Sequence, residues 1–149
     1  MIICLDIVGI NKQEQGFHIR DAIEQTMLTL MPKRRNPIFI DVEIARAGDM
    51  GRAIAMVHEE AQDHFLMTLD ESILDDTEEL ITTVCHETVH IKQYLRKECK
   101  DIAVDRKKWK GVEYDLNETN YYDLPWEKEA YFLQMILADK VMKINDLQS

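Results

Sequence analysis

Residues 75–100 read DDTEELITTVCHETVHIKQYLRKECK, and this stretch decides how the rest of the chain is interpreted. Its apolar residues recur at helical spacing and form one stripe: Leu80, Val84, Ile91 and Leu95. Asp75 or Asp76 is suited to cap the first turn, since a short carboxylate side chain accepts hydrogen bonds from free backbone N–H groups. The sequence therefore predicts a long helix over residues 75–100, and this is expected to be the main helix of the protein.

The predicted helix carries the pattern H-E-x-x-H as His86, Glu87 and His90. Residues four apart on a helix share a face, so the two imidazoles can point at one ion. Neutral imidazole nitrogen is a preferred ligand of Zn²⁺. Glu87 lies about 100° around the helix from His86, so we expect it to flank the ion as a general base that takes a proton from a metal-bound water.

A catalytic zinc site usually has three protein ligands, and the third must come from another part of the chain. A second helix is expected to begin near Pro125, and its first turns carry Glu127 and Glu129. Either carboxylate could complete the site if this helix packs against the first, and Ala130 would permit a close approach. They cannot both face the ion, because they lie about 200° apart around the helix.

The remaining segments predict an α+β fold in a single domain over residues 1–149, with a small, largely antiparallel sheet packed against helices. Residues 16–31 have helical spacing. Four runs are typical of strands, the last two as an antiparallel hairpin: 1–10, 37–45, 53–59 and 64–70. Residues 101–124 have no clear period and are expected to form a long ordered loop.

These motifs resemble a known protein family. HETVH, then Trp109 and Gly111, then Tyr121 or Tyr122, then PWEKEA is similar to small phage-type, zincin-like metallopeptidases of the gluzincin branch. The resemblance implies a minimal zincin-like fold with H-E-x-x-H on the central helix. It implies Glu127 as the third Zn²⁺ ligand, with Glu129 as the fallback.

The resemblance implies a zinc-dependent metallopeptidase that acts on a protein or peptide substrate. Glu87 would activate the metal-bound water that attacks the peptide bond. The candidate donors for the oxyanion of such a reaction are Tyr114, Tyr121 and Tyr122. The strand at 64–70 is expected to be an edge strand that binds the substrate backbone. The alternative is a zincin-fold interaction module that binds zinc and has little or no peptidase activity.

Composition excludes several other classes. The chain has a formal net charge of −10, which disfavours nucleic acid as a partner. No apolar run reaches the roughly 18 residues of a membrane span, and the N-terminal residues lack the basic start of a signal peptide. A cytoplasmic location is expected, in the host cytoplasm if the chain is phage-encoded. The three cysteines are expected to be free thiols, and the oligomeric state is left open.

Overall fold

The computed structural model describes residues 1–145 and begins with a strand–helix–strand unit. Strand β1 (Ile3–Val8) is followed by helix α1 (Gln13–Leu30) and strand β2 (Ile38–Ala45). The two strands pair in parallel, because the intervening helix returns the chain to the start of the sheet before the second strand begins. Strands β3 (Ala55–Ala61) and β4 (His64–Asp70) follow as the predicted antiparallel hairpin.

The four strands form one sheet in the order β1-β2-β4-β3. Strand β4 inserts between β2 and β3 and pairs with β2 in parallel. The α+β class is confirmed, but the prediction that this sheet is largely antiparallel is wrong, since two of its three pairings are parallel. The prediction also placed residues 64–70 at the edge, whereas β3 is the edge strand on that side of the sheet.

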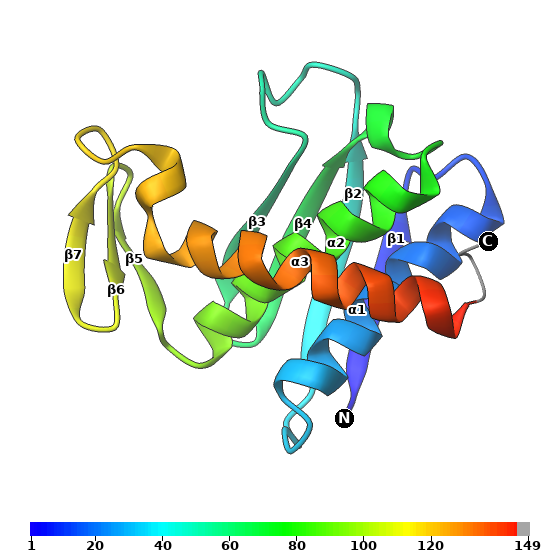
Figure 1. Ribbon diagram of the computed structural model, residues 1–149, viewed down its shortest axis with the longest axis horizontal. Coiled ribbons are helices and arrows are strands. Elements are labelled where there is room, and N and C mark those ends of the chain that lie inside the picture. The colour runs from blue at the N-terminus through cyan, green and yellow to red at the C-terminus, as the bar shows by residue number, and fades with distance from the viewer. Residues whose placement is uncertain (146–149) are drawn as a thin grey trace.

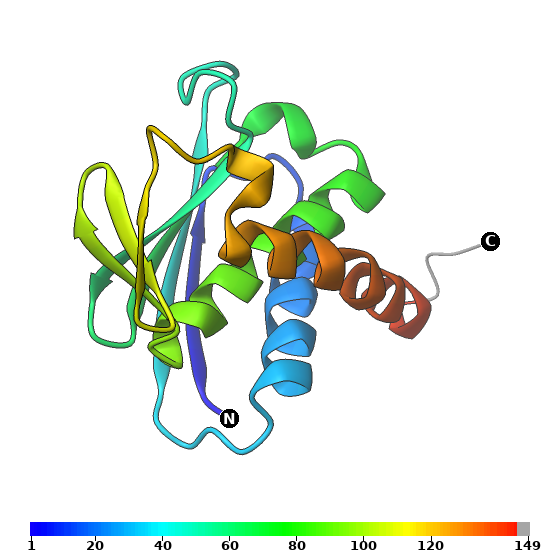
Figure 2. The same ribbon diagram turned by 60° about the vertical axis from the view of Figure 1, so that its left-hand side comes forward.

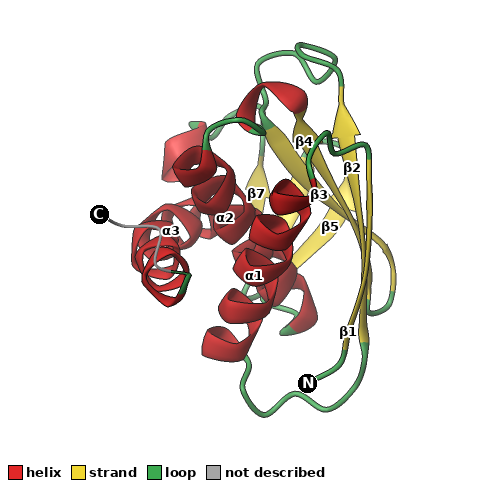
Figure 3. Ribbon diagram, turned by 90° about the vertical axis from the view of Figure 1, so that its right-hand side faces the viewer, coloured by secondary structure: helices red, strands yellow, loops and turns green. Residues whose placement is uncertain are grey.

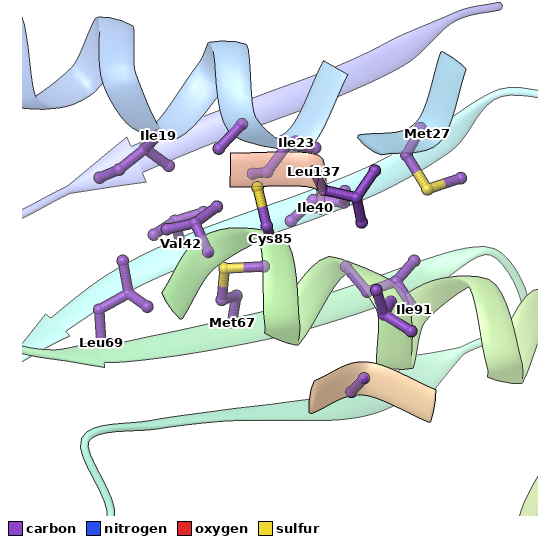
Figure 4. Close-up of a cluster of buried hydrophobic side chains, with 14 of the residues drawn as sticks. Ile19, Ile23, Met27, Ile40, Val42, Met67, Leu69, Cys85, Ile91 and Leu137 are labelled. Atoms are coloured by element: carbon purple, nitrogen blue, oxygen red, sulfur yellow. The ribbon is translucent and has the colours of Figure 1, made fainter. Parts of the chain in front are cut away.

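The helices cover one face of this sheet (Figure 3). A short turn of helix, η1 (Glu71–Ile73), connects β4 to helix α2 (Thr77–Leu95), which Asp76 caps by accepting a hydrogen bond from the backbone N–H of Glu79. The core lies between α1, α2 and the sheet (Figure 4), and its buried side chains include Ile23, Val42 and Met67. Cys85 is buried in the same core, and all three cysteines are free.

Helix α2 ends at Leu95 and does not reach the predicted residue 100. Lys97 has a positive φ of 57°, which a helix cannot contain, and Cys99 begins a new strand. A three-stranded antiparallel sheet then occupies most of the segment predicted as a loop. Its strands are β5 (Cys99–Ala103), β6 (Arg106–Trp109) and β7 (Val112–Asp115).

The second sheet lies at one end of the molecule, beside the start of helix α3 (Pro125–Ile144) (Figures 1 and 2). A second short helical turn, η2 (Tyr121–Asp123), leads into α3. Trp109 and Tyr114 pack against Trp126, whose ring centroid is 6.5 Å and 5.6 Å from theirs. Within residues 1–145, none of the helices has the length and apolar character needed to cross a membrane.

Candidate metal centre

Helix α2 presents His86 and His90 on one face, as their spacing predicts, with their ring centroids 4.9 Å apart. The opposite side of this helix carries Val84, Cys85 and Ile91, which are buried in the core. Burial of that side fixes the rotation of α2 about its axis. The two imidazoles are therefore held by the packing of the whole domain.

Helix α3 packs against α2 and supplies the third group. Glu127 Oε1 lies 3.0 Å from His86 Nε2 and 3.2 Å from His90 Nε2. Ala130, one turn further along α3, is fully buried, as expected for a close approach of the helices. The ligand atoms of the three residues lie within 4.8 Å of one another, and residues 1–145 contain no second such group of His, Cys, Asp and Glu.

The outer ring nitrogen of His90 is held by Gln93. The Gln93 amide NH₂ donates to the backbone carbonyl of Trp126 at 3.0 Å and to Glu129 Oε1 at 3.2 Å. These two acceptors fix which end of the amide is the NH₂, so the Gln93 oxygen faces His90 Nδ1 at 2.8 Å. His90 must then carry its proton on Nδ1, which leaves the lone pair of Nε2 facing Glu127 in the neutral ring.

His86 has a similar partner on α3, because its Nδ1 lies 2.7 Å from Gln134 Oε1. Ligating histidines usually have an outer hydrogen-bond partner of this kind. The sequence motifs had assigned this role to neither Gln93 nor Gln134. The spacing of Glu127, Tyr131 and Gln134 at i, i+4 and i+7 places them on one face of α3, and this signal could have identified Gln134.

Glu129, the fallback ligand, lies outside the triad. Its carboxylate pairs with Lys92 at 2.9 Å, and Lys92 also pairs with Glu98 at 2.8 Å. The expectation that Glu127 and Glu129 cannot both face one ion agrees with this arrangement. Glu129 instead receives the Gln93 amide, so it helps to orient the group that holds His90.

The three side chains of the triad are only 9–12% exposed, and their charges are strongly coupled. Burial alone would raise the pKa of Glu127, but hydrogen bonds from His86 and His90 outweigh it and hold this pKa well below its ordinary value. Burial alone would lower the pKa of His90, but the hydrogen bond to Glu127 and the charge of Glu87 raise it. The surroundings of the triad therefore favour an ionised Glu127 with a positive charge beside it.

This donor set fits a metal cation. Two Nε2 atoms converge on a single carboxylate oxygen, and lone pairs facing one another there repel unless a proton or a cation lies among them. Two imidazoles and one carboxylate are also a common ligand set of catalytic zinc. The triad of His86, His90 and Glu127 could hold a metal ion with these atoms.

Glu87 is buried beside the triad, with 6% of its surface exposed. Burial raises the pKa of Glu87, while the neighbouring His90 and His86 act in the opposite direction. A carboxylate with a raised pKa is a better proton acceptor than an ordinary one, because it holds a proton more readily near neutral pH. Glu87 therefore lies beside the triad, where the pattern predicts, and its pKa is raised.

The triad and Glu87 line a cavity of about 570 Å³. One wall is the edge strand β3 with Ala55, Met56 and Val57, and the strand predicted for this role, 64–70, does not line the cavity. Residue 57 pairs with Met67 of β4 on its other side. Since β3 is the last strand of its sheet, one backbone edge of β3 is available beside the triad for another extended chain.

Tyrosines form another part of the cavity wall. Tyr121 and Tyr122, two of the predicted donors, line the cavity, but Tyr114 does not line it and packs against Trp126 instead. Tyr131 was not predicted, and its ring centroid lies 4.6 Å from that of His86. Burial raises the pKa of Tyr121 and of Tyr131, so both phenols keep the proton that a hydrogen-bond donor needs.

Comparisons with known proteins do not assign this site. No protein-family model matches the chain, and neither the curated proteins nor the solved structures give a significant match. The resemblance to zincin-like metallopeptidases therefore stays a prediction from HETVH and PWEKEA. The function must therefore be inferred from the side chains around the triad.

Proposed function

We propose that this protein is a zinc-dependent metallopeptidase with a minimal zincin-like fold, of the gluzincin type that its motifs resemble. One observation supports this most strongly: Glu87 lies in the same cavity as a His86–His90–Glu127 triad, beside the exposed edge of β3. A purely structural metal site has no use for an additional buried carboxylate. A hydrolytic site requires one as a proton acceptor.

In the proposed reaction, His86, His90 and Glu127 hold Zn²⁺. A bound zinc ion supplies Lewis acidity, which acidifies water and polarises a carbonyl group. Glu87 takes the proton from the attacking water and delivers it to the leaving amine. Gln93 keeps the proton of His90 on Nδ1, so that Nε2 remains a ligand atom throughout.

The cavity walls suit a peptide substrate. A peptide in extended conformation can pair with the exposed edge of β3, which would place one of its carbonyl groups near the triad. Tyr121, Tyr122 and Tyr131 are the phenols in the cavity wall, and each could donate a hydrogen bond to the oxygen of a tetrahedral intermediate. Such a donor would contribute most once a bound peptide excludes water from the cavity.

The test compares Glu87→Gln with the unchanged protein. We expect both to bind one equivalent of zinc by elemental analysis, and we expect Glu87→Gln to cleave a random peptide library at least about 10²-fold more slowly, with products detected by mass spectrometry. Glu78→Gln is the matched control, since Glu78 is an exposed residue on the same helix. It should cleave at the unchanged rate.

The same experiment distinguishes the proposed peptidase from the alternative function, a zincin-fold interaction module. Stoichiometric zinc with no cleavage by the unchanged protein would support that module and contradict the peptidase. Absence of bound zinc in protein purified without chelators, and after incubation with zinc, would contradict both proposals. Loss of zinc in Glu87→Gln would show that Glu87 is a ligand and not a base.

A further inference from the structure

Helix α3 is apolar on two opposite faces. Its inner face is buried and includes Trp126, Ala130, Leu137 and Val141. Its outer face exposes Tyr131, Phe132, Met135 and Ile136, with 40%, 72%, 60% and 60% of their surfaces accessible. A helix on the surface of a monomer normally has a polar outer face, and a helix that is apolar all round is normally buried.

The outer face has the spacing of a helix–helix contact. A seam of four residues runs along this face at intervals of four, three and four, which is the spacing of a coiled coil. These residues are Lys128, Phe132, Met135 and Asp139. In Figure 3, α3 lies on the side of the molecule away from the four-stranded sheet. Phe132 and Met135 are 72% and 60% exposed, so no other element of residues 1–145 covers them.

We propose that the outer face of α3 is the interface of a homodimer, in which two copies of α3 pack antiparallel about a two-fold axis. If the axis passes between positions 133 and 134, Phe132 of each copy faces Met135 of the other. Tyr131 faces Ile136 in the same way. A two-fold interface requires a surface that complements itself, and this register achieves that with apolar contacts at the centre.

The charges at the two ends of the seam support a second copy as the occupant. In this register Lys128 of one copy faces Asp139 of the other, and the symmetry makes two such pairs. Lys128 is exposed, and the Asp139 side chain is 48% exposed although it also pairs with Lys143 of its own helix at 2.9 Å. A seam with a cation at one end and an anion at the other is complementary to its own antiparallel copy.

The apolar area approaches that of a stable interface. Tyr121 and Tyr122 adjoin Tyr131, with ring centroids 6.4 Å and 5.8 Å from its ring, and extend the apolar surface. Given their exposure and a full side-chain area of roughly 150–250 Å² for an aromatic residue, the six apolar side chains offer about 600–700 Å² per copy. A typical stable interface buries about 800 Å² per partner. The charged residues at the two ends of the seam, Lys128 and Asp139, would supply the remaining area.

The test is the oligomeric state of the full chain, measured by sedimentation velocity over a range of concentrations. We expect a dimer for the unchanged protein and an increase of at least about thirtyfold in the dimer dissociation constant for Phe132→Glu. Phe17→Glu is the matched control: Phe17 is a 56% exposed phenylalanine on α1, and its substitution should leave the dimer intact. Circular dichroism should show that both variants remain folded.

A pair of charge exchanges tests the register. Lys128→Glu alone should weaken the dimer, and the double variant Lys128→Glu with Asp139→Lys should restore it, since the two exchanges together rebuild both ion pairs. A monomer at all concentrations would overturn the proposal, and binding of an apolar dye at α3 in that monomer would point to a different occupant. A dimer unaffected by Phe132→Glu would overturn it as well.

Discussion

Gln93 is the residue that orients the ring of His90. Its NH₂ has two acceptors and its oxygen has one donor, so its amide has a single favourable orientation. We expect Gln93→Leu to weaken zinc binding by about 10–100-fold, because the outer partner of a ligating histidine is lost. Competition with a chromophoric chelator measures this affinity.

The control for this variant is Gln13→Leu, at an exposed position on α1. It should bind zinc as the unchanged protein does. If Gln93→Leu also bound zinc with unchanged affinity, Gln93 would be a packing residue only. Gln93→Leu should in addition cost about 1–3 kcal/mol of folding free energy, because the backbone carbonyl of Trp126 and the partly buried carboxylate of Glu129 each lose a donor.

His90 would make metal binding at the triad depend on pH. In the metal-free protein the pKa of His90 is raised above its ordinary value, so protonation of His90 stabilises the fold at low pH and this stabilisation is lost as the pH rises through the raised pKa. Zinc requires the unprotonated ring, so proton and metal compete. We therefore expect the zinc-induced increase in Tm to be small at pH 5.5 and to grow steadily towards pH 8.

Thermal melts with and without zinc across this pH range provide the measurement. His90→Asn, which lacks one of the three ligands, should show little or no zinc-induced increase in Tm at any pH in the same interval. A zinc-induced increase in Tm that is equally large at pH 5.5 and pH 8 in the unchanged protein would show that His90 is not a ligand.

At the scale of elements, the contact between α2 and α3 places Glu127 at the histidines. Ala130 is fully buried at this contact. Ala130→Leu adds three carbon atoms there and should cost about 1–3 kcal/mol of folding free energy. It should also move α3 away from α2 and so abolish tight zinc binding.

Ala138→Leu is the matched substitution for this test. Ala138 is also buried on α3, with 4% exposed, but it lies two turns further from Glu127. We expect Ala138→Leu to lose a similar amount of stability, measured by chemical denaturation, and to retain its affinity for zinc. Equal zinc affinity in both variants would show that the helix spacing at Ala130 does not control the site.

The helices that carry the site could be predicted from the sequence, but part of the sheet arrangement could not. His86 and His90 stand on a helix whose apolar stripe has a clear period, so both the helix and the shared face followed from spacing. Strands β5 to β7 have no comparable stripe, because only one residue of β5, Cys99, is buried and none of β6 and β7 is. Lys110 and Gly111 both have positive φ in the two-residue turn between β6 and β7. This turn was the local signal for a hairpin.

Local sequence patterns could not predict whether neighbouring strands of the first sheet run parallel or antiparallel. Strand β3 pairs with β4, and β4 in turn pairs with β2. The periodicity of the sequence does not predict which strands become neighbours. An alternating pattern such as Ile38, Ile40 and Val42 indicates which face is buried, but it is the same for parallel and antiparallel neighbours. The partners of a strand depend on long-range contacts, and these place β3 beside the triad.

At the scale of the whole molecule, a metal ion at the triad would join two parts of the chain that are far apart in sequence. Glu127 lies 41 residues after His86, and the second sheet lies between them. A ligand that binds only the folded state stabilises it by about 2.7 kcal/mol at a free concentration one hundred times its dissociation constant. We therefore expect removal of zinc to lower the Tm of the entire domain in one cooperative transition.

Differential scanning calorimetry before and after treatment with a chelator measures this effect, and Glu127→Gln is the control. A neutral amide of the same shape is a poor third ligand, so the Tm of Glu127→Gln should change little on addition of zinc or chelator. Because α2 carries core residues such as Val84 as well as both histidines, the site and the core should melt together. A metal-dependent transition confined to residues 99–124, detected by hydrogen exchange, would show instead that the triad stabilises only the second sheet.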